Sequence, residues 1–344
     1  MARKSKRALL SPADAADMPV TVTEVARAAG VSPITVSRAI HRPELVSEAT
    51  RTYVLEFVRA MGYVPNLLAG SLATSKSKLV AILIPTIAHS IFATAVQAMM
   101  DRLTAAGYQS LLGPTGYSPE KEETLLEAIL GRRPDGIVLT GTLHTPGSRQ
   151  RLASAGIPVV EAWDLSETCL DMQVGFSHEA VGVAVAEHFL AKGYQRFSVI
   201  TVDDPRAIRR CNGLIERLKA QRIENVPVET LPLPSTWEVG REGLKRLLSR
   251  PQRPELVFCS SDTVAMGVLA QAAESGLRVP EDMAVLGFGD TTNGRFTHPA
   301  LSTISVNAAV MGDEVAKALL RRFAGESAQR QFDSGFSLIE RAST

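Results

Sequence analysis

The chain has 344 residues, of which 45% are hydrophobic and 21% charged, a composition typical of a folded protein with two or three domains. Its three cysteines are far apart and form no C-x-x-C pair. We therefore predict no disulfide scaffold, no structural zinc site and a reducing, cytoplasmic location. The longest apolar run, residues 79–84, is too short to cross a membrane, and no signal-peptide core follows the basic start. These features exclude the secreted, membrane and disordered classes.

Charge is distributed unevenly along the chain. Residues 1–78 contain eleven Lys/Arg and six Asp/Glu, which gives this segment a net charge of +5. Since the whole chain has a net charge of +1, the remaining residues carry −4. A small basic segment on a larger acidic body indicates a nucleic-acid-binding module, the alternative being a basic segment with no partner.

Three short helices are predicted near the N-terminus, after a polar arm at residues 1–19 that we expect to be disordered. The first begins with the capping box Thr21-Val-Thr-Glu24. The second begins with Ser32-Pro33, an N-cap followed by proline at the first helical position. The third is predicted over residues 47–62. Two helices joined by a Gly-containing turn, with a third as support, predict a helix-turn-helix headpiece at residues 20–65.

From residue 79 onward, apolar strands alternate with amphipathic helices. This alternation predicts parallel sheets that are covered by helices on both faces. Ten strands are many for one open sheet, so we predict two doubly wound α/β lobes, lobe 1 at 79–176 and 304–330 and lobe 2 at 177–303 and 331–344. The predicted strands are 80–85, 109–113, 136–140, 158–162, 172–176, 197–201, 228–233, 256–260, 284–288 and 302–306.

The body carries no signature of catalysis. It contains no P-loop, no complete G-x-G-x-x-G after a strand, no G-x-S-x-G elbow and no H-E-x-x-H. Gly287-Phe288-Gly289 is a fragment typical of a strand-to-loop turn, and the six histidines show no metal-ligand spacing. We therefore predict that the protein is not an enzyme and has no catalytic residue, no metal and no cofactor.

Several segments resemble the LacI/GalR family of repressors over about residues 20–340. The matching segments are Thr21–Ile40, Val46-Ser47, Gly62-Tyr-Val-Pro-Asn66, and residues 80–85, 135–139, 156–160, 261–262 and 279–288. Within the family, residues 116–123, 139–146 and 169–176 are most similar to gluconate-operon repressors. One segment departs from the family, since His89-Ser-Ile-Phe92 stands where many members have Asn-Pro-Phe-Phe. The resemblance implies a body with the periplasmic-binding-protein fold of type I and a ligand between its lobes.

The second headpiece helix is predicted to present its outward residues to the major groove of DNA. Arg38 is suited to guanine O6 and N7, and Ile34 to a thymine methyl group. The resemblance implies that Pro33 and Ile34 hold the two main specificity positions, so apolar contact and DNA shape would supply discrimination. The alternatives are a generic helical bundle and an Arg38 that pairs only with an acidic neighbour. The predicted DNA-binding residues, phosphate contacts included, are Thr21, Ser32, Pro33, Ile34, Thr35, Ser37, Arg38, His41, Ser47, Thr50, Asn66 and Leu72.

Residues 66–78 are predicted to be a hinge helix and linker. The stretch from Asn66 to Thr74 includes Gly70 and is too short to be stably helical by itself. The resemblance implies a hinge helix that forms when two subunits pair on DNA, with Leu72 inserted into the minor groove. An ordinary linker, with Leu72 packed on the body, is the alternative. A marginal helix would let an effector release the DNA by separating the two hinges.

Ligands of open α/β sheets bind beyond the carboxyl ends of the strands. Side chains that follow the predicted strands are suited to a sugar, because aromatic rings pack on C–H faces and carboxylates accept from hydroxyls. The candidates are His89, Phe92, Tyr117, His144, Asp164, Arg210, Trp237, Ser261, Asp262 and Asp290, each with loop packing as its alternative role. Arg210 also matches the family's basic effector-binding position. We expect it to open a helix, where the helix N-terminus would favour an anion.

Together these features predict a DNA-binding transcriptional regulator with an all-α headpiece and an α/β effector-binding and dimerisation body at 79–344. We predict a homodimeric repressor that is released from double-stranded operator DNA by a sugar acid, gluconate or a keto-gluconate, and that has no membrane contact. One alternative is a sugar-binding protein of the same fold without operator function. Another is a regulator that responds to a neutral sugar or a purine.

Overall fold

The computed structural model describes residues 20–64 and 76–344, which belong to two compact units that divide between Ser77 and Lys78. The first unit contains the headpiece and the second contains the body. The predicted arm, the core of the predicted hinge, and the candidates Asn66 and Leu72 lie outside the described residues.

The described part of the headpiece, residues 20–64, consists of three α-helices and one turn of 3₁₀-helix, namely α2 (Val22–Ala28), α3 (Pro33–His41), η2 (Pro43–Leu45) and α4 (Glu48–Ala60). Thr21 and Glu24 form the predicted capping box at the start of α2. Gly30 has a φ of +66°, in the left-handed region, so a glycine suits the turn between α2 and α3. The three α-helices meet around the buried side chains of Val25, Val36 and Val54.

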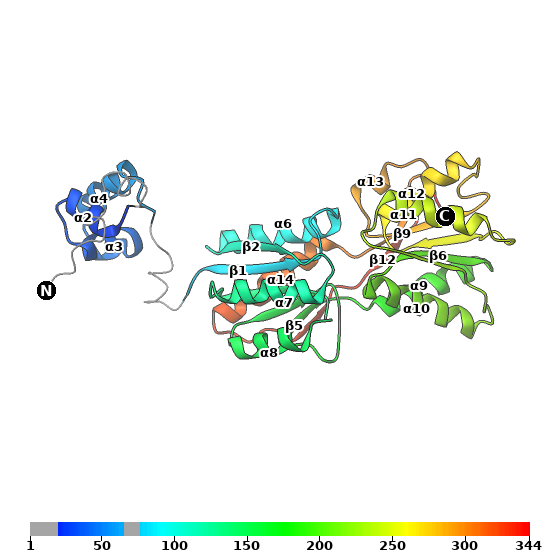
Figure 1. Ribbon diagram of the computed structural model, residues 1–344, viewed down its shortest axis with the longest axis horizontal. Coiled ribbons are helices and arrows are strands. Elements are labelled where there is room, and N and C mark those ends of the chain that lie inside the picture. The colour runs from blue at the N-terminus through cyan, green and yellow to red at the C-terminus, as the bar shows by residue number, and fades with distance from the viewer. Residues whose placement is uncertain (1–19, 65–75) are drawn as a thin grey trace. The chain divides into compact units, whose positions relative to one another are not determined.

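The first lobe of the body is a six-stranded sheet with helices on both faces (Figure 1). Its strand order is β11-β5-β4-β3-β1-β2, and all its pairings are parallel. Val80, Ile82 and Ile84 point to the face covered by α6 and α14, whereas Ala81 and Leu83 point to α7 and α8. The strands are β1 (Leu79–Ile84), β2 (Gln109–Pro114), β3 (Gly136–Thr140), β4 (Val159–Ala162), β5 (Met172–Gly175) and β11 (Gln331–Asp333); the helices are α6 (Ser90–Ala105), α7 (Pro119–Leu130), α8 (Pro146–Ala155) and α14 (Ala308–Phe323).

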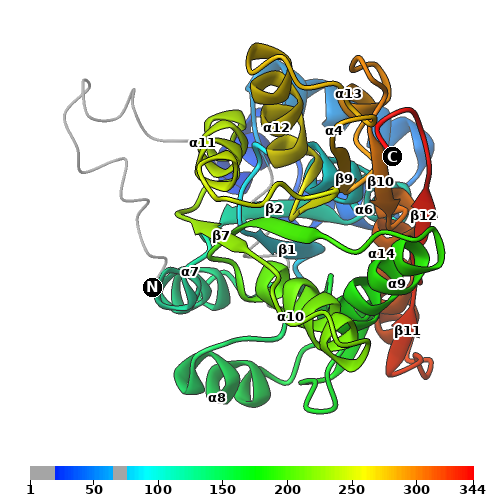
Figure 2. The same ribbon diagram turned by 90° about the vertical axis from the view of Figure 1, so that its right-hand side faces the viewer.

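The second lobe repeats this architecture with the strand order β12-β10-β9-β8-β6-β7. Helices α9 and α10 cover one face of its sheet, and α11 and α12 cover the other (Figure 2). Its strands are β6 (Phe197–Val202), β7 (Val228–Leu231), β8 (Leu256–Cys259), β9 (Ala284–Phe288), β10 (Ser302–Ser305) and β12 (Ser337–Ile339); its helices are α9 (His178–Ala191), α10 (Pro205–Ala220), α11 (Trp237–Leu248), α12 (Asp262–Glu274) and the short α13 (Thr292–Arg295).

Both sheets place their first strand between their second and third, so each has a topological switch point, at β1/β3 and at β6/β8. The carboxyl ends of the strands at such a point open a crevice in which ligands bind. Each lobe therefore provides one such crevice in which a ligand can bind. No helix among the described residues is long and apolar enough to span a membrane.

The structure corrects the predicted lobes at two places. β10 lies in the second sheet up to Ser305, because it pairs with β9 in parallel register, so the predicted return to lobe 1 at residue 304 is too early. β11 pairs with β5 in the first sheet, although residues 331–344 were predicted in lobe 2. β12 then joins the second sheet antiparallel to β10, so this sheet is not wholly parallel. Both late strands have only three residues, with exposed or half-exposed side chains, so neither forms a long apolar run in the sequence.

Candidate DNA-binding surface and effector cavity

Helix α3 presents one apolar face to the headpiece core and one open face to solvent. Val36 and Ala39 are fully buried, whereas 63% of Ile34 is exposed. The side chains of Ser37 and Arg38 are exposed as well. Pro33, at the first position of the helix, and His41, at its last, are also exposed. The predicted base-reading residues thus share an accessible helix face, and their contact with DNA stays a prediction.

The hydroxyl groups predicted to contact phosphates also hold the helix ends. Ser32 Oγ accepts from the Thr35 amide at 3.2 Å, and Ser47 Oγ accepts from the Thr50 amide at the same distance. The Thr35 and Thr50 hydroxyls lie 2.9 and 2.8 Å from the two serine oxygens. Thr21 caps α2 in the same way. These N-caps fix the start of each helix, which orients any phosphate contact made there.

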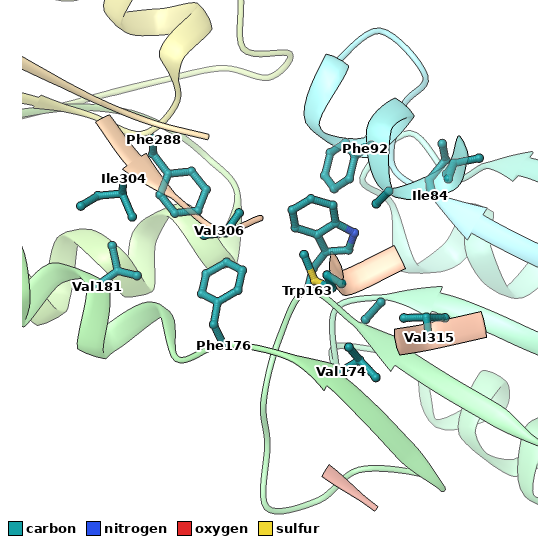
Figure 3. Close-up of a cluster of buried hydrophobic side chains, with 14 of the residues drawn as sticks. Ile84, Phe92, Trp163, Val174, Phe176, Val181, Phe288, Ile304, Val306 and Val315 are labelled. Carbon is teal, nitrogen blue, oxygen red and sulfur yellow. The ribbon is translucent and has the colours of Figure 1, made fainter. Parts of the chain in front are cut away.

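Figure 3 shows a cluster of buried aromatic side chains. This cluster lines a cavity of about 90 Å³ between the lobes. Phe92 from α6 and Trp163 after β4 meet edge to face with ring centroids 4.9 Å apart. Phe176, after β5, faces Phe288 at the end of β9, with ring centroids 6.0 Å apart. The four rings line the cavity and belong to one buried core that runs from the first lobe into the second. They offer flat apolar surfaces to the C–H groups of a ligand.

Arg206, Arg209 and Arg210 of α10 have i, i+3 and i+4 spacing, which places them on one helix face. Arg206 pairs with Asp204 of its own lobe through two hydrogen bonds, of 3.1 and 2.9 Å. Its guanidinium also lies 5.7 Å from the centre of the Phe92 ring in the other lobe. Arg209 forms an ion pair with Asp164. Two of the three cations therefore already have a carboxylate partner.

Arg210 is the exception, because no carboxylate of the described residues forms an ion pair with it. Its Nη2 donates to the Ser260 carbonyl at 2.9 Å, its Nη1 lies 2.9 Å from His178 Nδ1, and its Nε has no partner. The guanidinium lies 3.8 Å from the centre of the Phe288 ring. Burial lowers the pKa of Arg210 to about 10, with a partial offset from Asp204. The side chain is therefore a buried cation with hydrogen-bonding capacity to spare.

His178 is neutral in this setting. Burial, together with the Arg210 guanidinium, holds the pKa of His178 well below its usual value. Its Nε2 lies 2.9 Å from the Trp163 carbonyl and donates to it, so Nδ1 accepts from Arg210. Because Trp163 belongs to the first lobe and His178 to the second, this histidine orients Arg210 and links the lobes at the same time.

Two carboxylates of the cleft are held by neighbouring groups. Asp262, the first residue of α12, accepts from the Thr303 hydroxyl and the Thr291 amide, both at 2.6 Å, and burial raises its pKa. Asp164 packs against Gly175, where an added Cβ would lie 2.3 Å from the Asp164 amide nitrogen. A glycine is therefore required at this position of β5 for Asp164 to reach the cleft.

Six of the ten predicted effector residues line this cavity. They are His89, Phe92, Tyr117, Arg210, Ser261 and Asp262. Asp164 lines an adjoining cavity of about 120 Å³. Burial lowers the pKa of His89, with Asp204 opposing, and raises the pKa of Tyr117 to about 12. Both side chains are therefore uncharged donors at neutral pH.

Three predicted residues lie elsewhere. His144, expected at the cleft mouth, has a fully buried side chain between Glu122 and Glu161. Asp290 pairs with Arg295 and Arg341 and faces another hollow of the body. Trp237 is the first residue of α11, and 48% of it is exposed outside the cavity. In each case the residue does follow a strand, but its side chain turns away from the crevice.

The prediction that Arg210 opens a helix is wrong as well. Helix α10 begins at Pro205, so Arg210 lies in its second turn. The carboxylate of Asp204 caps the helix and accepts from the Arg206 amide at 2.9 Å. The helix N-terminus is thus already neutralised by the chain itself, and only the guanidinium remains for an anion.

Several residues that line the cavity were not predicted from the sequence. They are Trp163, Phe176, His178, Asp204, Arg206, Ser260, Phe288 and Thr291. Asp204-Pro205 carries the signal of a helix N-cap followed by proline, and this pair would have placed Asp204 and Arg206 at the carboxyl end of β6. The aromatic residues end apolar strands and read as core, which they also are.

Comparison with known proteins agrees with this geometry. Residues 21–66 match the family described as bacterial regulatory proteins, lacI family, and residues 186–344 match a periplasmic binding protein-like domain. The HTH-type transcriptional regulator GntR of Pseudomonas aeruginosa is 38% identical over 94% of this chain and 95% of its own. The chain belongs to the LacI family.

Solved LacI-family structures share the fold. A LacI-family transcriptional regulator from Silicibacter pomeroyi superposes with a TM-score of 0.89 at 31% identity, over 94% of this chain and 99% of its own. The lac repressor dimer bound to operator and the anti-inducer ONPF gives a TM-score of 0.82 at 25% identity, over 95% and 99% of the two chains. The predicted family and fold class are confirmed, and the protein is a DNA-binding transcriptional regulator.

Proposed function

We propose that this LacI-family regulator is a repressor that leaves its operator when a sugar acid such as gluconate binds in the cavity. Arg210 carries the proposal, because it is a buried guanidinium with no carboxylate partner among the described residues and with an unpaired Nε. A carboxylate is the group that best completes such a site, since it accepts two charge-assisted hydrogen bonds from one guanidinium.

The remaining lining suits the rest of a sugar acid. Phe92, Trp163 and Phe288 provide apolar surfaces, while Ser261, Asp262 and Thr291 provide polar groups. Because the ligand would contact both lobes, its binding would bias the angle between them, and such a change is the way to move a hinge on operator DNA. The predicted hinge at 66–78 is the element on which this change would act.

We propose a homodimer in the cytoplasm as the acting species, because operator DNA lies there and one headpiece offers few contacts for specific affinity. The lac repressor structure, described as a dimer on its operator, supports the same arrangement. Light scattering at micromolar concentration tests this, and a monomer would contradict it. No catalysed reaction, metal or cofactor is part of the proposal.

A gel-shift titration tests the function. The full chain would first select a pseudo-palindromic duplex from random DNA, and gluconate, glucose and hypoxanthine would then be added to the complex. We expect gluconate to release the duplex and the neutral sugar and the purine to leave it bound. Release by glucose or by hypoxanthine alone would contradict the acid, and failure to select any duplex would favour a sugar-binding protein without operator function.

A further inference from the structure

A second compartment adjoins the effector cavity on the side of the first lobe. It has a volume of about 120 Å³, and its own lining includes Thr115, Glu122, Thr140, Thr142 and Leu143. Three residues line both spaces: Tyr117, Asp204 and Arg206. The two cavities are therefore neighbours that share one wall, formed by a tyrosine ring and an Asp–Arg pair.

The position of this compartment follows from the sheet. Pro85 comes directly after β1, Thr115 after β2, Thr142 after β3 and Asp164 after β4. These are the carboxyl ends of the strands around the switch point of the first lobe, where an α/β sheet opens its crevice. The Arg210 cavity, in contrast, receives its charged groups from the second lobe. A ligand that fills both spaces would use the crevices of both sheets.

Two threonine hydroxyls of the compartment are available to a ligand only as hydrogen-bond acceptors. The Thr140 hydroxyl donates to the Leu83 carbonyl at 3.0 Å, and the Thr142 hydroxyl donates to Asp164 Oδ2 at 3.1 Å. Since each hydroxyl has only one proton, only lone pairs remain for a ligand. Glu122 adds a nearly buried carboxyl group, one oxygen of which lies 2.6 Å from His144 Nδ1.

The described charges of this lining are already paired, which leaves no cation for an anion in this space. Asp204 binds Arg206 through two hydrogen bonds, Asp164 pairs with Arg209, and Glu122 pairs with His144. The walls between these groups are apolar, with Pro85, Pro119, Pro205 and Leu143. Acceptors set in an apolar wall suit a chain of C–H groups that carry hydroxyl donors.

We infer that this compartment is a subsite for the hydroxylated tail of the effector, whose carboxylate binds at Arg210. This inference rests on the proposed function and adds to it the orientation of the effector in the cleft. The ligand passes the wall formed by Tyr117 and the Asp204–Arg206 pair, so its length matters. A polyhydroxy acid of six carbons is held in both compartments, whereas an acid of four carbons is held only at Arg210.

Calorimetry on the full-length protein with two acids tests the subsite. We expect gluconate, with six carbons, to bind about tenfold more tightly than erythronate, with four. In Thr142→Val, which keeps the shape of the side chain and removes its oxygen, the preference for gluconate falls to about threefold or less, because gluconate alone is weakened. Leu143→Ala, on an exposed side chain, lowers the preference in the same direction.

Thr263→Val is the matched control, because Thr263 lines the Arg210 cavity and not the second compartment. It changes the affinity for both acids alike and leaves their ratio unchanged. Equal binding of the two acids by the wild-type protein, or a ratio that Thr142→Val and Leu143→Ala leave unaltered, overturns the subsite while the proposed function stands. Failure of both acids to bind overturns the two together.

Discussion

Arg209 of α10 and Asp164, which follows β4, form an ion pair that joins the two lobes of the body. The side chain of Asp164 is 1% exposed and that of Arg209 is 28% exposed. Asp164 also accepts from the Thr142 hydroxyl and from the Leu165 amide at 2.9 Å. The arginine therefore reaches from the second lobe to a carboxylate that the first lobe holds rigidly, and it favours the closed cleft.

Removal of this contact is expected to open the cleft more often. In Arg209→Ala the Asp164 carboxylate stays buried without its cation, which costs about 1–2 kcal/mol of folding stability, less than for a fully buried pair because Arg209 is partly exposed. We expect gluconate to dissociate several-fold faster, as measured by stopped-flow fluorescence of Trp163 and Trp237.

Arg217→Ala is the control, since Arg217 on the same helix pairs with the exposed Glu187 and its loss should cost less than about 1 kcal/mol. Equal dissociation rates in the two variants would contradict a role for the Arg209–Asp164 pair.

Substitution of Arg210 is expected to weaken effector binding and to leave operator binding unchanged. In Arg210→Ala the carboxylate of the effector loses two charge-assisted hydrogen bonds, so affinity for gluconate should fall by about 1.5–3 kcal/mol, roughly 10- to 100-fold. Operator affinity should stay unchanged, which gives a repressor that gluconate no longer releases. Arg210→Lys keeps the charge without the planar fork and should recover only part of the affinity. Release of Arg210→Ala at the wild-type gluconate concentration would show that the carboxylate binds elsewhere.

The sequence predicted more of the fold than of the cavity, and the reason is physical. Strands such as β1 and helices with N-caps such as Ser32 are marked by local patterns, so their positions are readable from neighbouring residues alone. The order of strands in a sheet also tells where a crevice opens. Which way a side chain turns beyond a strand depends instead on partners that are distant in the chain. His144 turns inward, where its Nε2 lies 3.2 Å from an oxygen of Glu161, 17 positions later.

The same limit applies to short strands and to shared surfaces. β11 is defined by its pairing with β5, about 160 residues earlier. The residues Gln331–Asp333 have no local pattern that predicts a strand. His178 was not predicted because a lone histidine at the start of a helix has many ordinary roles. Its position between Arg210 and the Trp163 carbonyl arises only when the two lobes come together.

Operator recognition gives a third prediction. Arg38 is exposed on α3, and its replacement in Arg38→Ala should weaken specific operator binding by about 1–3 kcal/mol if it contacts a guanine in the major groove. Arg59→Ala, on an exposed residue of the last turn of α4, serves as the charge-matched control. Gel shifts on the selected operator and on unrelated DNA should show a loss of specificity for the first variant alone. An equal loss on both duplexes would assign Arg38 to phosphates.

The buried His144 gives a prediction about pH. Burial by itself lowers the pKa of His144, but hydrogen bonds and charge interactions with Glu122 and Glu161 raise it to about 9. Because the pKa is higher in the folded state than in the unfolded chain, the protonated histidine stabilises the fold. This contribution is fully present below pH 6.5 and is lost as the pH rises through 9. The shift corresponds to a contribution on the order of 3 kcal/mol.

Denaturant unfolding between pH 6 and pH 10 measures this contribution when the wild-type protein is compared with His144→Gln. The variant should be less stable at pH 6, because Glu122 and Glu161 then face each other without a cation, and the difference should shrink as the pH approaches 10. Other titratable groups are common to both proteins, so their contributions cancel in the difference. Parallel stability curves across this range would contradict a protonated His144 in the fold.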